Sequence, residues 1–404
     1  MVKAASLAQP SSALSSSTPL PLPLPPLSLY VHFPWCVRKC PYCDFNSHTL
    51  HGEVPESDYI AALLADFESQ REAVQGRQIV SVFFGGGTPS LFSPESLGRL
   101  LAQLRSRLAF AEDIEITLEA NPGTIEHGRF SGYRAAGINR VSLGAQSFAD
   151  ESLRQLGRIH AAADTQRAVA ELELAGIDNF NLDLMYALPD QDLGAALADI
   201  DSAVRLGPTH ISHYELTLEP GTVFGGRPPA GLPDGEHAFE MQLACQQRLD
   251  QAGYAQYEVS AYARTDRRCR HNLNYWHFGD YLGLGAGAHG KISTIGDGFR
   301  IERTWREREP RRYLGNSSSA PLRRFVPSQD LRFEFLMNVL RLREGFEEPE
   351  FELRTGLPAE GLIGSLESLR TRNLLEKSHG NWRASALGFR FLNDVLGEFL
   401  PPPR

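Results

Sequence analysis

The chain has 404 residues, of which 42% are hydrophobic and 22% are charged, and its formal net charge is −9. A chain of this length can bury one large core and a second, smaller one. The acidic balance disfavours nucleic acid as a partner, and no apolar run approaches the roughly 18–20 residues of a membrane span.

The first 26 residues combine a Ser-rich stretch with alternating leucines and prolines. Proline cannot continue a helix, and a Leu-Pro repeat favours an extended chain. The stretch has neither the unbroken apolar centre of a secretory signal nor the arginines of a transit peptide. We therefore expect residues 1–26 to be a disordered extension, with organelle targeting as a minor alternative, and we expect a cytoplasmic protein.

From residue 27 onward, short apolar runs alternate with amphipathic helical stretches. The runs are Leu27–Phe33, Ile79–Phe84, Ile114–Ala120, Arg140–Gln146, Phe180–Tyr186 and His210–Thr217. The helices expected between them are Tyr59–Ala73, Glu95–Leu108, Arg129–Ala136, Ala162–Leu174 and Leu193–Leu206. Six strand–helix units predict an α/β fold in residues 27–225, with a parallel sheet curved into a partial (β/α)6 TIM-like barrel, because a complete barrel needs eight.

The rest of the chain divides into two regions. Residues 226–325 hold Gly/Pro loops, a helix near Glu236–Ala252 and the motif HNLNYW, and we expect them to link two domains. Residues 326–404 show helices at Asp330–Leu342 and Leu362–Arg370, a hairpin-like stretch at Leu374–Arg383 and a final helix at Ala386–Phe399. This order predicts a small α+β, winged-helix-like C-terminal domain.

Three of the five cysteines, Cys36, Cys40 and Cys43, fall within eight residues, in YVHFPWCVRKCPYCDFN. An odd, clustered set does not suit a disulfide framework and indicates a reducing compartment. Thiolates bind zinc or iron–sulfur clusters, but three cysteines cannot complete a tetrahedral zinc site, and no histidine follows at zinc-finger spacing. On a [4Fe–4S] cluster, three thiolates would leave one iron open to a small molecule.

The spacing C-x3-C-x2-C after a first strand resembles the signature of the radical SAM superfamily. The flanking YVHFPWC and PYCDFNS are similar to the group of oxygen-independent coproporphyrinogen III oxidases and their haem-chaperone relatives (HemN and HemW), over nearly all of residues 27–400. The resemblance implies a [4Fe–4S] cluster on the three cysteines, S-adenosylmethionine (SAM) at the open iron, and an electron donor such as a flavodoxin or ferredoxin. A reduced cluster can pass one electron to the sulfonium of SAM.

Polar residues lie near the ends of several predicted strands, and in a parallel barrel these ends share one mouth. They are Glu119, Gln146, Arg158 and Asp183. Taken singly, each is as readily a structural hydrogen-bonding group as a ligand contact. As a set they resemble the superfamily's SAM-binding positions, together with Tyr30, Tyr42, Gly86, Gly87 and Thr88. Carboxylates suit ribose hydroxyls, and Arg158 suits a carboxylate.

Two functions remain open: an oxidase that decarboxylates coproporphyrinogen, and a haem chaperone that delivers haem to acceptor haem proteins, including a membrane-associated one. Another radical SAM modifying enzyme would usually bring further cysteine clusters. The oxidases carry an additional cysteine where this chain has Phe45, so the resemblance favours the chaperone and does not predict oxidase activity. Whether the chain is an enzyme at all stays open.

The motif HNLNYW at residues 271–276 resembles the HNxxYW haem motif of the chaperones. His271 is the candidate axial ligand of haem iron, beside Tyr275 and Trp276 as flat apolar surfaces. His277, His289 and Cys269 are alternative iron ligands. Cys245 lies on an apolar helix face, where a core position is expected.

Overall fold

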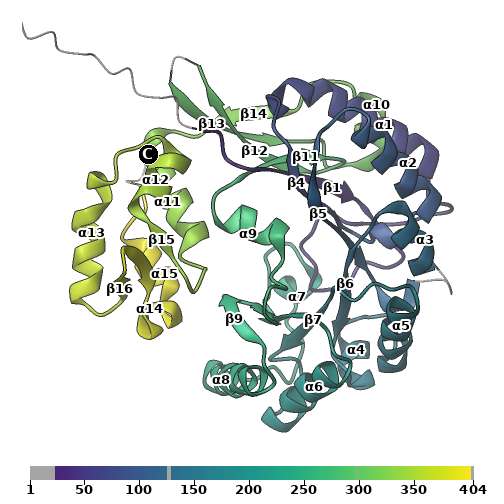
Figure 1. Ribbon diagram of the computed structural model, residues 1–404. Coiled ribbons are helices and arrows are strands. Elements are labelled where there is room, and N and C mark those ends of the chain that lie inside the picture. The colour runs from purple at the N-terminus through teal and green to yellow at the C-terminus, as the bar shows by residue number, and fades with distance from the viewer. Residues whose placement is uncertain (1–22, 125–128, 297, 402–404) are drawn as a thin grey trace, which may run out of the picture.

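The computed structural model describes residues 23–124, 129–296 and 298–401 (Figure 1). Most of the predicted disordered extension therefore lies outside the described residues. The largest sheet has twelve strands in the order β14-β13-β12-β11-β1-β4-β5-β6-β7-β8-β10-β9. Its central six strands pair in parallel and are β1 (Leu27–Phe33), β4 (Ile79–Gly86), β5 (Phe110–Ala120), β6 (Arg140–Gln146), β7 (Phe180–Tyr186) and β8 (His210–Glu215).

These six strands are the predicted partial barrel, which stays open because β1 continues to β11 and β8 to β10. Helices cover the outer face of the arc (Figure 1). They are α1 (Glu56–Gln70), α2 (Pro94–Arg105), α3 (Arg129–Ala136), α4 (Asp150–Gln155), α5 (Ala162–Leu174) and α6 (Leu193–Arg205), with 3-10 turns η1 (Arg71–Val74), η2 (Pro89–Leu91) and η3 (Pro122–Thr124). Every residue of β6 is buried, as expected for a strand with both faces covered.

Residues 226–325, predicted as a link, extend this sheet at both edges. The elements are α7 (Val223–Gly226), α8 (Gly235–Gln251), β9 (Ala255–Glu258), β10 (Ala261–Ala263), α9 (Arg270–Trp276), β11 (Asp280–Leu284), β12 (His289–Ile295), β13 (Phe299–Trp305), α10 (Pro310–Asn316) and β14 (Leu322–Phe325). Helix α9 contacts β1, β4 and β11 and lies in the open side of the arc (Figure 1). The HNLNYW motif is thus carried into the barrel.

The C-terminal domain is built around a second apolar cluster, which includes Phe335, Leu366 and Trp382 and extends to Tyr257, Phe278 and Ile301 of the preceding region. Its elements are α11 (Ser328–Val339), β15 (Phe346–Glu347), α12 (Glu348–Thr355), α13 (Glu360–Thr371), β16 (Leu375–Ser378), β17 (Asn381–Ala384), α14 (Ala386–Arg390) and α15 (Leu392–Gly397). The three strands form an antiparallel sheet, as an α+β domain requires. The single final helix predicted at Ala386–Phe399 is wrong, because Phe391 leaves the helical region (φ −112°, ψ 41°) and splits it.

In the part of the chain that the structure describes, no helix is both long and apolar enough to cross a membrane.

Candidate functional site

The three clustered cysteines lie on the loop that follows β1. The loop begins and ends in a short parallel pair, β2 (Trp35–Cys36) and β3 (His48–Thr49). Lys39 Nζ donates to the backbone oxygens of Phe45 (3.0 Å) and Ser47 (3.1 Å), which closes the loop on itself. Cys36, Cys40 and Cys43 are partly buried and line one cavity of about 340 Å³, which we call the cysteine pocket.

Each of the three sulfurs has a polar neighbour. Thr88 Oγ1 donates to Cys36 Sγ (3.5 Å) and Arg158 Nη1 to Cys40 Sγ (3.7 Å), while the Ser47 hydroxyl lies 3.8 Å from Cys43 Sγ. Burial raises the pKa of the Cys36 thiol, and the neighbouring thiolates of Cys43 and Cys40 raise it further. A positively charged iron core would stabilise these thiolates, so the three residues fit a [4Fe–4S] cluster.

A single ion is a poorer match to the same pocket. Among the described residues, no group of three or more His, Cys, Asp or Glu side chains is arranged to hold one metal ion. In a [4Fe–4S] cluster each thiolate binds a different iron, so the ligands need not converge on one point. The donor set therefore suits a cluster better than zinc.

The end of β4 and the turn after it contain Gly86, Gly87 and Thr88, and we call this segment the glycine loop. It lies directly against the cysteine loop. The backbone N–H of Gly87 donates to the Phe33 oxygen (2.7 Å), and that of Thr88 to the Trp35 oxygen (2.8 Å). A Cβ on Gly87 would lie 2.5 Å from the Trp35 oxygen, and Gly86 has a φ of +112°. Both positions therefore need glycine.

The predicted strand-end residues converge on the cysteine pocket. Its lining includes Tyr42, Gly86, Gly87, Glu119, Gln146, Arg158 and Asp183, together with the three cysteines. Two of the predicted residues lie elsewhere. Thr88 contacts Cys36 and lines a small separate cavity with Cys40 and Arg158, and Tyr30 lines a larger neighbouring cavity.

Two buried carboxyl groups set the electrostatics of the cysteine pocket. Glu119 Oε2 accepts the Gly86 backbone N–H (3.1 Å), and burial, with Asp183 nearby, raises the pKa of Glu119 to about 8. Burial raises the pKa of Asp183. Its carboxyl group accepts hydrogen bonds from Asn181 Nδ2 (2.7 Å) and the Ser142 hydroxyl (3.2 Å), which act in the opposite direction on the pKa. A protonated Glu119 can donate as well as accept a hydrogen bond, and Asp183 adds acceptor oxygens, so the pocket suits a ligand with hydroxyl or amino groups.

Arg38 and Arg158 are the arginines in the lining of this pocket, and Arg158 is held in place by hydrogen bonds. Its Nη2 donates to the Gly144 oxygen (2.9 Å) and to the Asn121 side chain, and its buried Nε makes no hydrogen bond to the described residues. An arginine with an unused hydrogen-bond donor in a polar pocket suits an anionic group of a ligand.

Sequence reasoning missed several polar residues of this pocket. Tyr214 donates its hydroxyl to Gln146 Oε1 (2.8 Å), and Ser142 contacts Asp183. Tyr214 was accessible to prediction, because in the β8 sequence HISHYE the residues His210, Ser212 and Tyr214 alternate and so share the inner face of the barrel.

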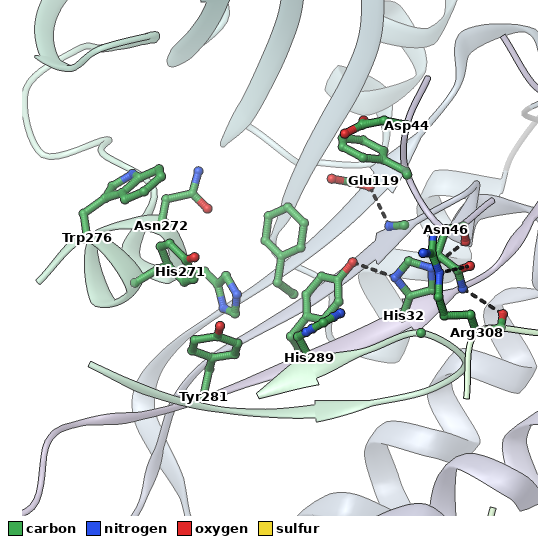
Figure 2. Close-up of a pocket in the computed structure, with 16 residues that line it drawn as sticks. His32, Asp44, Asn46, Glu119, His271, Asn272, Trp276, Tyr281, His289 and Arg308 are labelled. Atoms are coloured by element: carbon green, nitrogen blue, oxygen red, sulfur yellow. Dashed lines mark hydrogen bonds between the residues drawn. The ribbon is translucent and has the colours of Figure 1, made fainter. Parts of the chain in front are cut away.

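A second cavity of about 680 Å³ adjoins the cysteine pocket, and we call it the aromatic cavity (Figure 2). Asp44, Phe45, Gly86 and Glu119 line both. The other lining residues are Tyr30, His32, Asn46, Phe83, His271, Asn272, Tyr275, Trp276, Tyr281, Gly287, His289 and Arg308. Its walls are thus mostly aromatic rings, with polar groups at a few points, which is typical of a ligand site.

His271 enters the aromatic cavity from α9. Glu115 accepts the His271 backbone N–H (3.1 Å) and so holds the start of the helix. His271 Nδ1 lies 3.0 Å from the Ser81 hydroxyl, and the ring packs against Phe83 with 5.0 Å between centroids. Burial, with Arg140 nearby, lowers the pKa of His271 to about 3, so the imidazole is neutral at physiological pH.

The alternative iron ligands differ in their surroundings. His277 lies outside the lining, with Nδ1 on Glu350 (2.8 Å) and Nε2 on Glu344 (3.2 Å). Burial alone would lower its pKa, but these two carboxylates raise it to about 9. Cys269 is buried against Glu115 (3.6 Å) and is also outside the lining, whereas His289 belongs to it.

Cys245 is fully buried within the barrel core, as the sequence predicted.

The chain matches two protein-family models and a solved structure. A family model described as the radical SAM superfamily matches residues 30–201, and one described as the HemN C-terminal domain matches residues 326–391. The solved coproporphyrinogen III oxidase HemN of Escherichia coli, a radical SAM enzyme, superposes with a TM-score of 0.77 at 23% identity, over 93% of this chain and 90% of its own. That likeness shows a common fold.

Two curated proteins named Heme chaperone HemW are far more similar in sequence. The protein from Escherichia coli is 48% identical over 377 residues, which cover 93% of this chain and 99% of its own. The protein from Haemophilus influenzae is 47% identical over 93% of this chain and 98% of its own. The chain therefore belongs to the HemW family of the radical SAM superfamily.

Proposed function

We propose that the chain is a haem chaperone that binds a [4Fe–4S] cluster, SAM and haem, and delivers haem to acceptor haem proteins. The observation that carries the proposal is the aromatic cavity, which contains the neutral imidazole of His271 and adjoins the cysteine pocket. The identity to proteins named Heme chaperone HemW over nearly the whole chain supports it.

Cys36, Cys40 and Cys43 are the proposed cluster ligands. When bound, the cluster supplies one-electron chemistry and an open iron for SAM. The protein positions the cluster ligands and surrounds the site. Thr88 and Ser47 place hydroxyls beside two of the sulfurs, and the glycine loop leaves room for a ligand against its backbone.

The remaining residues of the cysteine pocket are proposed to hold SAM. Glu119 and Asp183 are acceptors for ribose hydroxyls or for an amino group, Gln146 adds an amide, and Arg158 suits the carboxylate of the methionine part. Tyr42 lines the same pocket. Tyr30 lies on the aromatic cavity, so its side chain is assigned to the haem side of this arrangement.

Haem is the proposed occupant of the aromatic cavity. The rings of Phe83, Tyr275 and Tyr281 offer flat apolar surface for a porphyrin. Nε2 of His271 is the proposed iron ligand, because Nδ1 is engaged by Ser81 and a neutral imidazole binds haem iron. His289 is the second candidate, since it lines the same cavity.

The alternative of a coproporphyrinogen III oxidase is less well supported at Phe45. This residue is 58% exposed and lines both cavities, so it occupies the boundary between the SAM and haem sites. The additional cysteine of the oxidases can bind a metal or exchange a proton, whereas a phenyl ring can do neither. A flavodoxin or ferredoxin as electron donor and a membrane-associated acceptor are further proposals, which rest on the family alone.

Haem titration of the anaerobically reconstituted protein tests the proposal. We expect saturable binding with a Soret band that shifts or weakens in His271→Ala, and no change in His237→Ala, because His237 lies on the exposed face of α8. The same protein, given SAM and a reductant, should leave coproporphyrinogen unconverted. Turnover of that substrate without saturable haem binding would favour the oxidase. If haem binding is unchanged in His271→Ala but altered in His289→Ala, the proposed iron ligand would be His289 instead of His271.

A further inference from the structure

The polar groups of the aromatic cavity are unevenly distributed. Figure 2 shows Trp276 and His271 at one side of the cavity, Asn46 and Arg308 at the other, and His289 between them. Arg308 follows β13 and precedes α10, so the segment that continues the sheet beyond β1 provides the charged side. The cavity therefore has an aromatic end on α9 and, opposite it, an end where Arg308 supplies a cationic side chain, while the carboxyl groups of Asp44 and Glu119 also line the cavity.

The position of Arg308 is built by Asn46. Asn46 Nδ2 donates to the backbone oxygens of Ala286 (2.9 Å) and Arg308 (3.0 Å), and its Oδ1 lies 3.5 Å from Arg308 Nε. A Cβ on Gly287 would lie 2.2 Å from Asn46 Nδ2, so the neighbouring loop makes room for this amide. The arginine is thus held at the cavity wall by its backbone while its side chain remains exposed.

The guanidinium of Arg308 has no carboxylate partner among the described residues. Neighbouring arginines do: Arg303 Nη2 lies 2.7 Å from Glu334, and Arg306 is paired with Asp66. The two adjacent acids are engaged with backbone instead, since Glu307 Oε1 accepts the Arg308 N–H (3.0 Å) and Glu309 Oε2 accepts the Arg312 N–H (2.8 Å).

His289 lies close to this charge. Burial lowers the pKa of His289, and the nearby guanidinium of Arg308 lowers it further. The neutral ring can donate one hydrogen bond to an anion that also meets the arginine. The two planar N–H donors at the tip of a guanidinium match the two oxygens of a carboxylate.

We propose that Arg308, assisted by His289, binds a carboxylate of the ligand in the aromatic cavity, and so fixes which edge of that ligand faces the cationic end. This inference rests on the proposed function, in which the ligand is haem and the carboxylate is a propionate. The propionate edge then points to Arg308 and the apolar edge to Trp276. The site selects planar apolar ligands that carry an acidic edge.

Comparing the affinities of haem and haem dimethyl ester isolates the contribution of the carboxylate site, because the ester keeps the ring and the iron but has no carboxylate. Both are titrated into the reconstituted wild type, Arg308→Gln and, as a matched control, Arg312→Gln, which removes an exposed arginine outside the lining. We expect Arg308→Gln to weaken haem binding about 10-fold or more and to leave ester binding unchanged. Wild type should bind the ester more weakly than haem by a similar factor, and Arg308→Lys should recover part of the loss.

Equal weakening for both ligands would overturn the proposal, since Arg308 would then act on the shape of the cavity. Unchanged haem affinity in Arg308→Gln would overturn it as well. In both cases wild type still binds haem, so the proposed function survives. If wild type binds neither ligand, the proposed function fails and the carboxylate site fails with it.

Discussion

Nδ1 of His271 lies 3.0 Å from the hydroxyl oxygen of Ser81, so that Nε2 is the ring nitrogen left for a ligand. The hydroxyl belongs to a short network across two strands. Ser81 Oγ is 2.7 Å from Ser28 Oγ, which accepts a hydrogen bond from Asn274 Nδ2 (2.9 Å) of α9 itself. Helix α9 is thus anchored to β1 and β4 at the point where it presents its histidine, and an iron on Nε2 requires Nδ1–H to donate to Ser81.

Replacing Ser81 by alanine should weaken haem binding about 2- to 10-fold, because it removes one hydrogen bond that orients the ligand. The measurement is a haem titration followed by the Soret band. Ser90→Ala is the matched control, since Ser90 is equally buried but its hydroxyl has no hydrogen-bond partner in the described structure. Equal haem affinity in Ser81→Ala and Ser90→Ala would argue against ligation through Nε2 of His271.

Replacing any one of Cys36, Cys40 or Cys43 by alanine should abolish the brown chromophore of the reconstituted protein, which should otherwise hold about four irons per chain. Absorbance and iron analysis measure this. Cys245→Ala should keep both, because this thiol is fully buried in the core away from the cysteine pocket. Full iron retention in the triple variant would remove the basis of the proposed cluster.

The central strands could be predicted closely from the sequence. Buried parallel strands form continuous apolar runs, and β1, β6 and β7 have the predicted bounds. The outer strands gave no such signal. Strand β10 is apolar and buried but has only three residues, too few to show a pattern, and all four residues of β14 are exposed. Extension of the sheet beyond the barrel therefore depended on tertiary pairing.

The candidate site was predictable in part for the same reason. Glu119 and Gln146 lie at the C-terminal ends of β5 and β6, which the topology brings together, and Asp183 lies in the middle of β7 but lines the same pocket. Strand position could not assign Tyr30 to one of two adjoining cavities. Nor could it separate His271 from His277, because the carboxylates that engage His277 lie 67 and 73 residues away in the chain.

Asp183→Asn should weaken SAM binding about 10-fold while the cluster stays intact, because it removes a carboxylate oxygen from the pocket but keeps the shape of the side chain. Equilibrium dialysis of SAM against the reconstituted protein measures the affinity, and absorbance reports the cluster. Asp201→Asn, which lies outside the pocket and pairs with Arg248, is the control. Unchanged SAM affinity in Asp183→Asn would show that this residue has only a structural role.

Glu119 should make the SAM-free protein less stable as the pH rises. Its pKa is raised from 4.5 to about 8 by burial and by Asp183, so the folded protein keeps a proton that the unfolded chain releases above pH 4.5. The stabilisation is complete below pH 4.5 and is lost as the pH rises through about 8, by on the order of a few kcal/mol. Thermal midpoints from pH 5 to 8.5 should fall more steeply for wild type than for Glu119→Gln. Parallel curves would contradict the assignment.

His277 joins the end of α9 to the C-terminal domain. Its two ring nitrogens contact Glu350 and Glu344, and Arg268 Nη1 also lies 2.7 Å from Glu344. The raised pKa of about 9 means that His277 carries a charge at neutral pH. The residue after the HNLNYW motif therefore forms an ionic contact between two parts of the fold.

His277→Ala should lower the free energy of unfolding at pH 6 by about 1–3 kcal/mol, because it removes the cation that contacts both Glu344 and Glu350. The folded pKa is raised from 6.5 to about 9, so this stabilisation is complete below pH 6.5 and is lost as the pH rises through 9. Wild type and variant should therefore differ in thermal midpoint at pH 6 and converge near pH 10. His237→Ala, which loses only an exposed pair with Asp234, should match wild type at both pH values. A difference that persists unchanged at pH 10 would mean that His277 contributes through packing and not through charge.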